Sequence, residues 1–243
     1  MKRDLLRIFR RISLLPLLLL AVACTDIAPR GGGDILVLGD SIMAWNRSSD
    51  AAIPDAIGQT LGRAVTSKAV SGAQFDNGSR LAGVVGFDIQ RQLPGGTWQW
   101  VVMNGGANDL NADCNCGACA SFVDALIGPD ARSGAIPTFI RKVQAQTGAR
   151  VLWMGYYAGS GTGTFAGCRD DLVAIEARVA RFAMTEPGVF FVDAEDVIDR
   201  AEQSLFARDN IHPSAKGSAK IGAHLARTIN TADPRSQIPR RAL

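Results

Sequence analysis

Short apolar runs that alternate with longer helical segments are the feature of this sequence that most constrains its fold. Each run is rich in aliphatic or aromatic residues and is too short for a helix, which is typical of strands buried on both faces. The expected strands are 34–39, 64–70, 98–104, 150–156 and 189–193. The expected helices are 51–62, 119–128, 135–147, 169–185 and 214–229. This alternation predicts an α/β fold with a parallel sheet that is covered by helices on both faces.

Length and composition indicate one globular domain. The chain has 243 residues, of which 47% are hydrophobic and 20% are charged, which suits a sizeable core. We expect the domain to cover residues 34–230 and to be followed by a solvated C-terminal tail over residues 231–243.

The first 23 residues have the pattern of a signal peptide. A basic head precedes an apolar stretch over residues 12–23, which is shorter than the roughly 20 residues that span a bilayer. Residues 20–24 read Leu-Ala-Val-Ala-Cys and resemble a bacterial lipobox. We therefore expect a lipid on Cys24, a flexible tether over residues 24–33, and an exported protein in the periplasm or anchored to a membrane surface. The alternative is ordinary cleavage after Ala23, with Cys24 unmodified.

The net charge argues against a nucleic-acid partner. The whole chain carries a formal net charge of +3, but the first 23 residues alone carry +4, from five basic residues and one acid. Removing that segment would leave −1, so no basic patch remains to bind nucleic acid.

A serine directly follows the first expected strand. Residues 39–42 read Gly-Asp-Ser-Ile, and the carboxyl ends of parallel strands are where open α/β sheets build their sites. The glycine permits a tight turn that lifts the hydroxyl of Ser41 out of the sheet. The alternative is a polar turn in which Ser41 or Asp40 caps a helix.

A serine nucleophile needs a base, and the chain has only two histidines. His224 lies in an expected helix, where a lone histidine usually has no catalytic role. His212 lies in a loop before that helix, three residues after Asp209. The Asp209 carboxylate can accept the proton of one ring nitrogen and thereby orient the other toward the serine. Without the serine, a turn or capping role would suit Asp209 better.

Two further positions can stabilise a developing oxyanion. Gly72 follows the second expected strand and can offer its backbone N–H, and Asn108 follows the third strand and can offer its side-chain amide. Together with the N–H of Ser41, they would give three donors. Taken singly, Gly72 and Asn108 are equally ordinary turn formers.

These blocks, in this order, resemble the SGNH hydrolases, also called GDSL esterases and lipases. The blocks are Gly-Asp-Ser-Ile at 39–42, Gly72, Gly-Ala-Asn-Asp at 106–109 and Asp-Asn-Ile-His at 209–212. The resemblance implies a three-layer, flavodoxin-like α/β/α sandwich. It also implies Ser41 as nucleophile, Gly72 and Asn108 as oxyanion donors, His212 as base and Asp209 as its orienter. Ile42 stands where the family usually has leucine, a packing position.

The remaining cysteines favour disulfides. Four cysteines remain besides Cys24, and an even number in an exported chain suggests two disulfides. They are Cys114, Cys116, Cys119 and Cys168, and we expect Cys168 to pair with Cys114 or Cys116. A zinc site is the alternative, although the spacing lacks paired Cys-x-x-Cys knuckles.

Two stretches near the cysteines have the composition of inserted loops, at residues 110–120 and at the glycine-rich 158–167. We expect them to be joined by a disulfide and to shape the substrate pocket. A flavin or nucleotide loop at residues 160–164 is a weaker interpretation, because such loops follow the first strand.

We therefore expect a serine esterase that hydrolyses carboxylic esters through an acyl-enzyme on Ser41, with no metal and no organic cofactor. Its partner would be a small-molecule or polymer-borne ester. Acyl transfer or deacetylation on cell-envelope sugars or lipids would use the same acyl-enzyme and is an alternative. A non-catalytic exported binding lipoprotein is an alternative from another class.

Overall fold

The computed structural model describes residues 33–159 and 164–233. The expected signal peptide, Cys24, most of the tether and most of the C-terminal tail lie outside the described residues. Residues 160–163 of the glycine-rich stretch also lie outside them. Among the residues that are described, no helix is both long and apolar enough to cross a bilayer.

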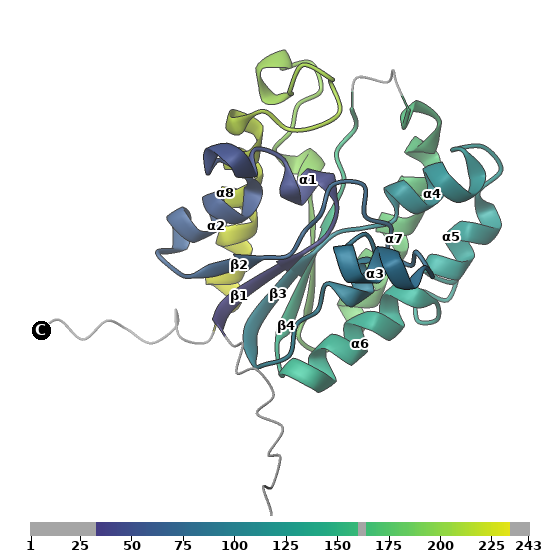
Figure 1. The fold of residues 1–243 in the computed structure, drawn as a ribbon, viewed down its shortest axis with the longest axis horizontal. Coiled ribbons are helices and arrows are strands. Elements are labelled where there is room, and N and C mark those ends of the chain that lie inside the picture. Colours follow the sequence, from purple (N-terminus) through teal and green to yellow (C-terminus); the bar gives the residue numbers. More distant parts are fainter. Residues whose placement is uncertain (1–32, 160–163, 234–243) are drawn as a thin grey trace, which may run out of the picture.

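Five parallel strands form one sheet, as predicted (Figure 1). The strands are β1 (Gly33–Leu38), β2 (Val65–Ser67), β3 (Trp98–Met103), β4 (Arg150–Gly155) and β5 (Val189–Asp193). Their order across the sheet is β2-β1-β3-β4-β5. The chain therefore winds outward from β1 in both directions, and the carboxyl ends of β1 and β3 flank the point where that direction reverses. Open α/β sheets place their ligand sites at such a point.

Helices cover both faces of this sheet. The α-helices are α1 (Ser41–Ala44), α2 (Ile53–Leu61), α3 (Arg80–Val85), α4 (Ala107–Cys114), α5 (Ala120–Leu126), α6 (Ala135–Thr147), α7 (Arg169–Thr185) and α8 (Ala215–Ala232). Short 3₁₀ helices occur at η1 (Arg47–Ser49), η2 (Ile89–Arg91), η3 (Ala166–Cys168), η4 (Ala194–Asp196) and η5 (Gln203–Leu205).

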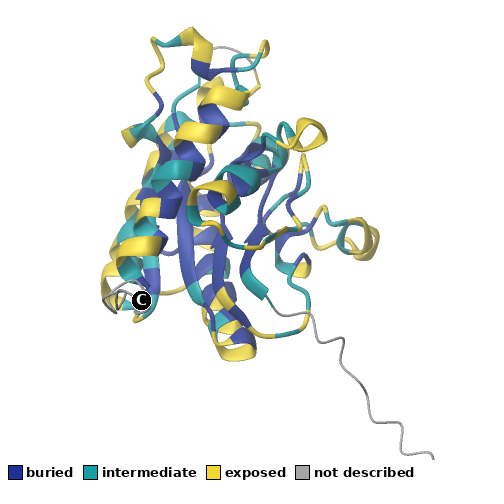
Figure 2. Cartoon of the chain, turned by 90° about the vertical axis from the view of Figure 1, so that its left-hand side faces the viewer, coloured by how far each residue is buried: buried dark blue, intermediate teal, exposed yellow. Residues whose placement is uncertain are grey.

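Helices α2 and α8 pack against each other on one face of the sheet, and α6 and α7 lie on the other (Figure 1). The contact between α2 and α8 is close because Gly222 has no side chain. A Cβ at this position would meet Ala56 and the carbonyl oxygen of Ile53. The strands and the inward faces of these helices are buried, whereas the outward faces are exposed (Figure 2). The layered fold therefore matches the predicted α/β/α sandwich.

The expected elements differ from the structure mainly where helices are short. All five predicted strands and all five predicted helices are present, although β2 is shorter than expected and α8 runs to Ala232. Helices α1, α3 and α4 were not predicted. The expected loop at 110–120 is wrong in its first part, because residues 110–114 complete α4. Asn and Asp favour loops in isolation, but here Leu110 is buried and fixes the helix against the core.

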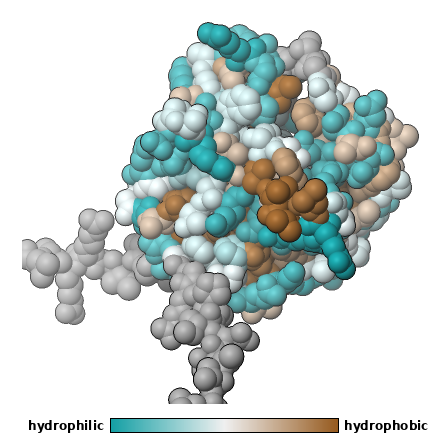
Figure 3. Space-filling view, in the orientation of Figure 1, coloured by the Kyte–Doolittle hydropathy of each residue, from teal (hydrophilic) through white to brown (hydrophobic). Residues whose placement is uncertain are grey.

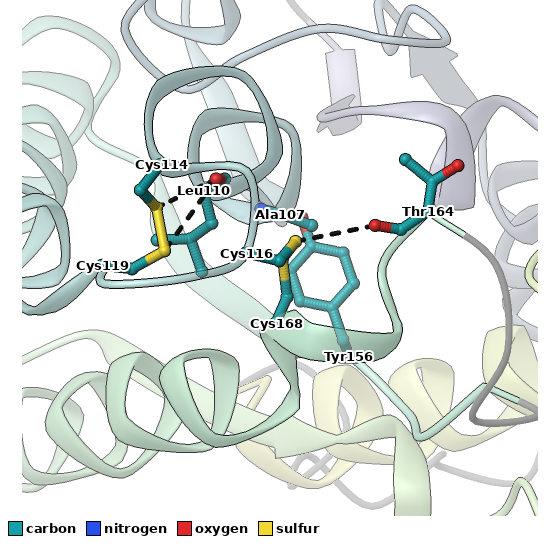
Figure 4. The surroundings of a disulfide bond; sticks show 8 residues. All are labelled: Ala107, Leu110, Cys114, Cys116, Cys119, Tyr156, Thr164 and Cys168. Carbon is teal, nitrogen blue, oxygen red and sulfur yellow. Dashed lines mark hydrogen bonds between the residues drawn. A yellow bond between two sulfur atoms is a disulfide. The ribbon is translucent and has the colours of Figure 1, made fainter.

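Two disulfides join the segments around α4, α5 and α7 (Figure 4). Cys116 bonds to Cys168, which is one of the two pairings expected for Cys168, and Cys114 bonds to Cys119. The four thiols that a zinc site would need are therefore consumed in disulfides. The first bond fixes the loop after α4 to the residue that precedes α7.

Helix α7 carries a buried carboxyl group in the core. Glu176 is 6% exposed, and its Oε1 accepts a hydrogen bond of 2.6 Å from the backbone N–H of Tyr156. Burial raises the pKa of Glu176 to about 8, and the nearby carboxylate of Asp193 adds to this shift. Glu176 therefore folds into the core more readily as a neutral acid than as a carboxylate.

Removing each disulfide should reveal how much its loop length contributes to stability. The bond between Cys116 and Cys168 closes a loop between residues 52 positions apart, whereas the bond between Cys114 and Cys119 joins residues 5 positions apart. Replacing each pair with serine opens the corresponding loop. The loop-entropy relation gives losses of about 4 and about 2 kcal/mol in the free energy of unfolding. Urea unfolding of the two double variants measures both. Equal losses would show that loop closure does not govern these bonds.

Glu176→Gln should change how stability depends on pH. In the unfolded chain this carboxyl group ionises near its ordinary pKa, while in the folded chain its pKa is about 8. The unfolded state therefore loses the proton first, and the parent protein loses stability as pH rises from about 4.5 to about 8. The glutamine keeps the acceptor for Tyr156 but cannot ionise, so its advantage over the parent should grow with pH to a few kcal/mol. Urea unfolding at pH 5 and pH 8 tests this, with Asp170→Asn on the same helix as the control. An advantage that does not change with pH would contradict the prediction.

Candidate active site

The turn after β1 is fixed by side chains from two other segments. Gly39 has a φ of +146°, and a Cβ there would collide with the side chain of Asn104. The amide of Gln92 accepts from the N–H of Gly39 at 2.8 Å and donates to its carbonyl at 2.9 Å. Gln92 therefore pairs with Gly39 as a neighbouring strand would, and holds the backbone just before Ser41.

Asp40 is buried beneath this turn and accepts three hydrogen bonds. Its Oδ1 accepts from Asn104 Nδ2 and from the N–H of Ile42, both at 2.9 Å. Its Oδ2 accepts from the hydroxyl of Tyr156 at 2.5 Å. Burial raises the pKa of Asp40, and these hydrogen bonds partly oppose the rise. Asp40 thus joins α1 to the ends of β3 and β4.

Ser41, His212 and Asp209 form one chain of contacts. The Oγ of Ser41 lies 2.8 Å from His212 Nε2, and His212 Nδ1 lies 2.7 Å from Asp209 Oδ2. The serine begins α1, while the other two residues lie in the loop before α8, 171 positions later in the case of the histidine. The structure therefore brings together the three residues that the sequence singled out.

Asp209 orders the loop that carries the imidazole. Its Oδ1 accepts from the backbone N–H groups of Ile211 and His212, both at 3.0 Å. Partial burial would raise the pKa of Asp209, but the hydrogen bonds from His212 and Ile211 outweigh it and lower the pKa. A carboxylate facing Nδ1 favours a proton on that nitrogen, which leaves the Nε2 lone pair directed at Ser41.

The imidazole also stacks on an indole, a contact that sequence reasoning did not predict. The ring centroids of Trp45 and His212 are 3.8 Å apart, with an interplanar angle of 6°. Asn46 follows and donates from Nδ2 to the carbonyl of Pro213 at 3.0 Å. The segment after Ser41 therefore contacts the loop that carries His212 directly. The sequence offers one signal for the stack, which is that Trp45 lies four residues after Ser41.

Gly72 and Asn108 lie on segments that bond to each other. Gly72 occupies a turn with a φ of +81°, and the Nδ2 of Asn108 donates to the carbonyl of Ala73 at 2.9 Å. The next residue, Asp109, is buried and accepts from the N–H groups of Phe75 and Asp76. Burial raises the pKa of Asp109 to about 6. The start of α4 is thus fixed against the segment that follows Gly72. The amide nitrogen of Asn108 carries a second N–H, for which the described part of the chain gives no acceptor.

A pocket of about 310 Å³ opens beside Ser41. Its walls come from α1, the start of α4, the segment after β4, the start of α7 and the loop before α8. They are formed by Asp40, Ser41, Ile42, Ala107, Asn108, Tyr156, Tyr157, Ala158, Gly159, Phe165, Ala166, Arg169, Leu172, Arg200 and Ile211. Of the two expected loops, only the glycine-rich one contributes to these walls.

The remaining candidates lie elsewhere. His224 is on α8, where it contacts Asp196 and Arg227. Within residues 33–159 and 164–233, no group of three His, Cys, Asp or Glu side chains is arranged to hold a metal ion.

Comparison with solved structures identifies the fold. A Slackia heliotrinireducens protein assigned to the SGNH hydrolases is 22% identical, with a TM-score of 0.56 over 82% of this chain and 99% of the other. An extracellular lipase from Streptomyces rimosus is 19% identical, with a TM-score of 0.54 over 81% and 99%. A family 3 carbohydrate esterase from Clostridium thermocellum is 16% identical, with a TM-score of 0.54 over 82% and 96%.

Sequence comparison shows the family to which the chain belongs. No curated protein matches the chain significantly. The model of the GDSL-like lipase/acylhydrolase family, however, matches residues 37–220 and so covers every block singled out above. The chain therefore belongs to the GDSL-like lipase/acylhydrolase family and is an ester hydrolase.

Proposed function

We propose that this protein is a serine esterase that hydrolyses carboxylic esters through an acyl-enzyme on Ser41. The observation that carries the proposal is the 2.8 Å contact between Ser41 Oγ and His212 Nε2, with Asp209 2.7 Å from the other ring nitrogen. A serine hydroxyl becomes a good nucleophile only when a positioned base takes its proton.

The proposed reaction uses His212 twice. The imidazole accepts the Ser41 proton while the hydroxyl oxygen attacks the ester carbonyl carbon. The imidazolium, stabilised by Asp209, then protonates the leaving alcohol as the acyl-enzyme forms. Water enters, gives a proton to the same imidazole and attacks the acyl carbon. The bond between that carbon and Ser41 Oγ then breaks, the imidazolium returns its proton to Oγ, and the acid leaves. The stacked ring of Trp45 keeps the imidazole in place through both transfers.

Three donors would stabilise the oxyanion of each tetrahedral intermediate. The N–H of Ser41 belongs to the first turn of α1, where backbone N–H groups lack intrahelical partners. The N–H of Gly72 and the free amide N–H of Asn108 complete the set. Donors that are fixed before the reaction need no reorganisation when charge develops, which is why their effect on the rate is large.

The pocket sets the size of the group beside the reacting carbonyl. Tyr157, Phe165 and Leu172 give it apolar walls, and its volume of about 310 Å³ suits a short chain or one sugar-sized group better than a long acyl chain. Ester substrates of small molecules or polymers fit this description. One structural relative is an esterase of carbohydrates and another is a lipase.

We also propose export, with a lipid on Cys24. The basic and apolar N-terminal residues, the lipobox-like run before Cys24 and two disulfides in the domain support this location. One structural relative is an extracellular lipase.

Ser41→Ala should abolish ester hydrolysis and labelling by a fluorophosphonate, with a fall in kcat of roughly 10⁴- to 10⁶-fold and little loss of stability. The two histidines provide a matched comparison, because His212→Ala should lose activity similarly and His224→Ala should not. Rates with a short chromogenic ester and the urea midpoint of each variant measure this. Near-normal hydrolysis by Ser41→Ala would remove the serine from the proposed role.

Asn108→Ala should lower kcat by roughly 10²- to 10³-fold with little change in KM, because an oxyanion donor acts mainly in the transition state. Steady-state kinetics separate the two constants, and Asn111→Ala on the same helix is the control. A raised KM with unchanged kcat would instead indicate that Asn108 binds the substrate.

A further inference from the structure

Helix α3 exposes apolar side chains that the fold does not use. None of its six residues is buried. Leu81 is 73% exposed, Val84 is 84% exposed and Val85 is 50% exposed, and Phe87 just beyond the helix is 41% exposed. We call these four residues the α3 patch. Figure 3 shows it as a group of hydrophobic side chains on the front of the molecule, over the position of α3 in Figure 1. Apolar side chains that are grouped and exposed to water add no folding stability to a monomer. Such a group is typical of a surface that contacts another molecule or a membrane.

The helix is held in place without these side chains. Ser79 caps its start by accepting from the N–H of Ala82, and Gly86 ends it with a φ of +85°. The side chain of Arg91 lies against Gly83, and the Gln92 amide donates to the carbonyl of Gly86 at 2.9 Å. Polar contacts on one side therefore support α3, while the α3 patch faces outward.

The α3 patch is tied to the candidate active site. The amide nitrogen of Gln92 that bonds to Gly86 also bonds to Gly39, two residues before Ser41. On the other side, Gln74 donates to the carbonyl of Phe87 at 3.1 Å, and the ring of Phe87 lies beside Gly72. A surface that contacts the α3 patch would therefore lie close to the proposed oxyanion donors.

The size of the α3 patch favours a lipid surface over a protein. A six-residue helix is about 9 Å long at 1.5 Å per residue, whereas each partner in a standard protein interface buries roughly 800 Å². A short apolar helix with a phenylalanine beside it can instead insert into the headgroup boundary of a bilayer, which adapts its shape. From residue 76 to residue 91 the charged side chains are Asp76, Arg80, Asp88 and Arg91, so their charges cancel.

The expected anchor can reach the same bilayer. Nine peptide steps separate Cys24 from Gly33, which allows about 30 Å when extended. A domain of 200 residues has a radius of gyration of about 16 Å, so a tether of this length exceeds that radius and leaves the domain room to turn on the membrane surface. We propose that the α3 patch contacts the lipid bilayer and directs the active site toward esters of short acyl groups held at a lipid–water interface. The substrate part of this proposal depends on the proposed esterase function, whereas the contact does not.

Hydrogen exchange of the full-length exported protein tests the contact without relying on activity. With phosphatidylcholine vesicles, amides in residues 80–87 should exchange at least about fivefold more slowly, because water is excluded from a helix inserted at the interface. Ser41→Ala should show the same protection, which separates failure of the contact from failure of the proposed chemistry. Since the local charges cancel, adding phosphatidylglycerol or salt should change little. Unchanged exchange over residues 80–87 would overturn the proposal.

A pair of double variants tests whether the α3 patch promotes hydrolysis of esters in a bilayer. Leu81→Ser with Val84→Ser should lose the vesicle protection and hydrolyse a vesicle-borne ester about tenfold more slowly, since two buried apolar side chains are removed from the interface. Its rate on a soluble short ester should be unchanged. Val173→Ser with Met184→Ser, which removes two exposed apolar side chains from α7, should behave like the parent. If the first variant retains the vesicle-borne rate, or if it only abolishes a dimer seen by light scattering, the lipid contact is wrong.

Discussion

The buried carboxylate of Asp40 is the interaction on which the rest of the site depends. It accepts hydrogen bonds from Asn104 after β3, from Tyr156 after β4 and from the start of α1, so one side chain joins the ends of three neighbouring strands. A buried polar group that lost these partners would cost several kcal/mol, which is why the network holds a single arrangement. Ser41 is positioned because the residue before it is buried and held by three hydrogen bonds.

A second set of contacts brings the histidine loop to that fixed point. Asn46 bonds to Pro213 and to Ser218, so the chain just after Ser41 is joined to the start of α8. The close packing of α2 on Gly222 holds the same two segments together further along. Tyr157 adds a bond from its hydroxyl to the carbonyl of Ile211 at 2.8 Å. The contact between Ser41 and His212 is therefore supported both by the segment after Ser41 and by the segment after β4.

The elements that could be predicted from the sequence are those with a strong local signal. Buried parallel strands are continuous apolar runs, and α6 and α7 are long enough for a clear helical pattern. Helix α4 has a polar sequence, and its place depends on contacts with residues 73–76, which no local pattern contains. The same limit applies to the site. Residues 39–42 and 209–212 are recognisable blocks, but the stack of Trp45 on His212 and the bond from Tyr156 to Asp40 join residues more than 100 positions apart.

Helix α8 has a consequence for how the enzyme matures. It is the last element among the described residues, and the loop that carries Asp209 and His212 comes directly before it. A growing polypeptide would then pair all five strands and present the Ser41 hydroxyl while His212, the proposed proton acceptor, still has no fixed position. On the proposed mechanism, hydrolytic competence would then arrive only when this helix docks on α2, and a chain clipped before it would be inert toward esters.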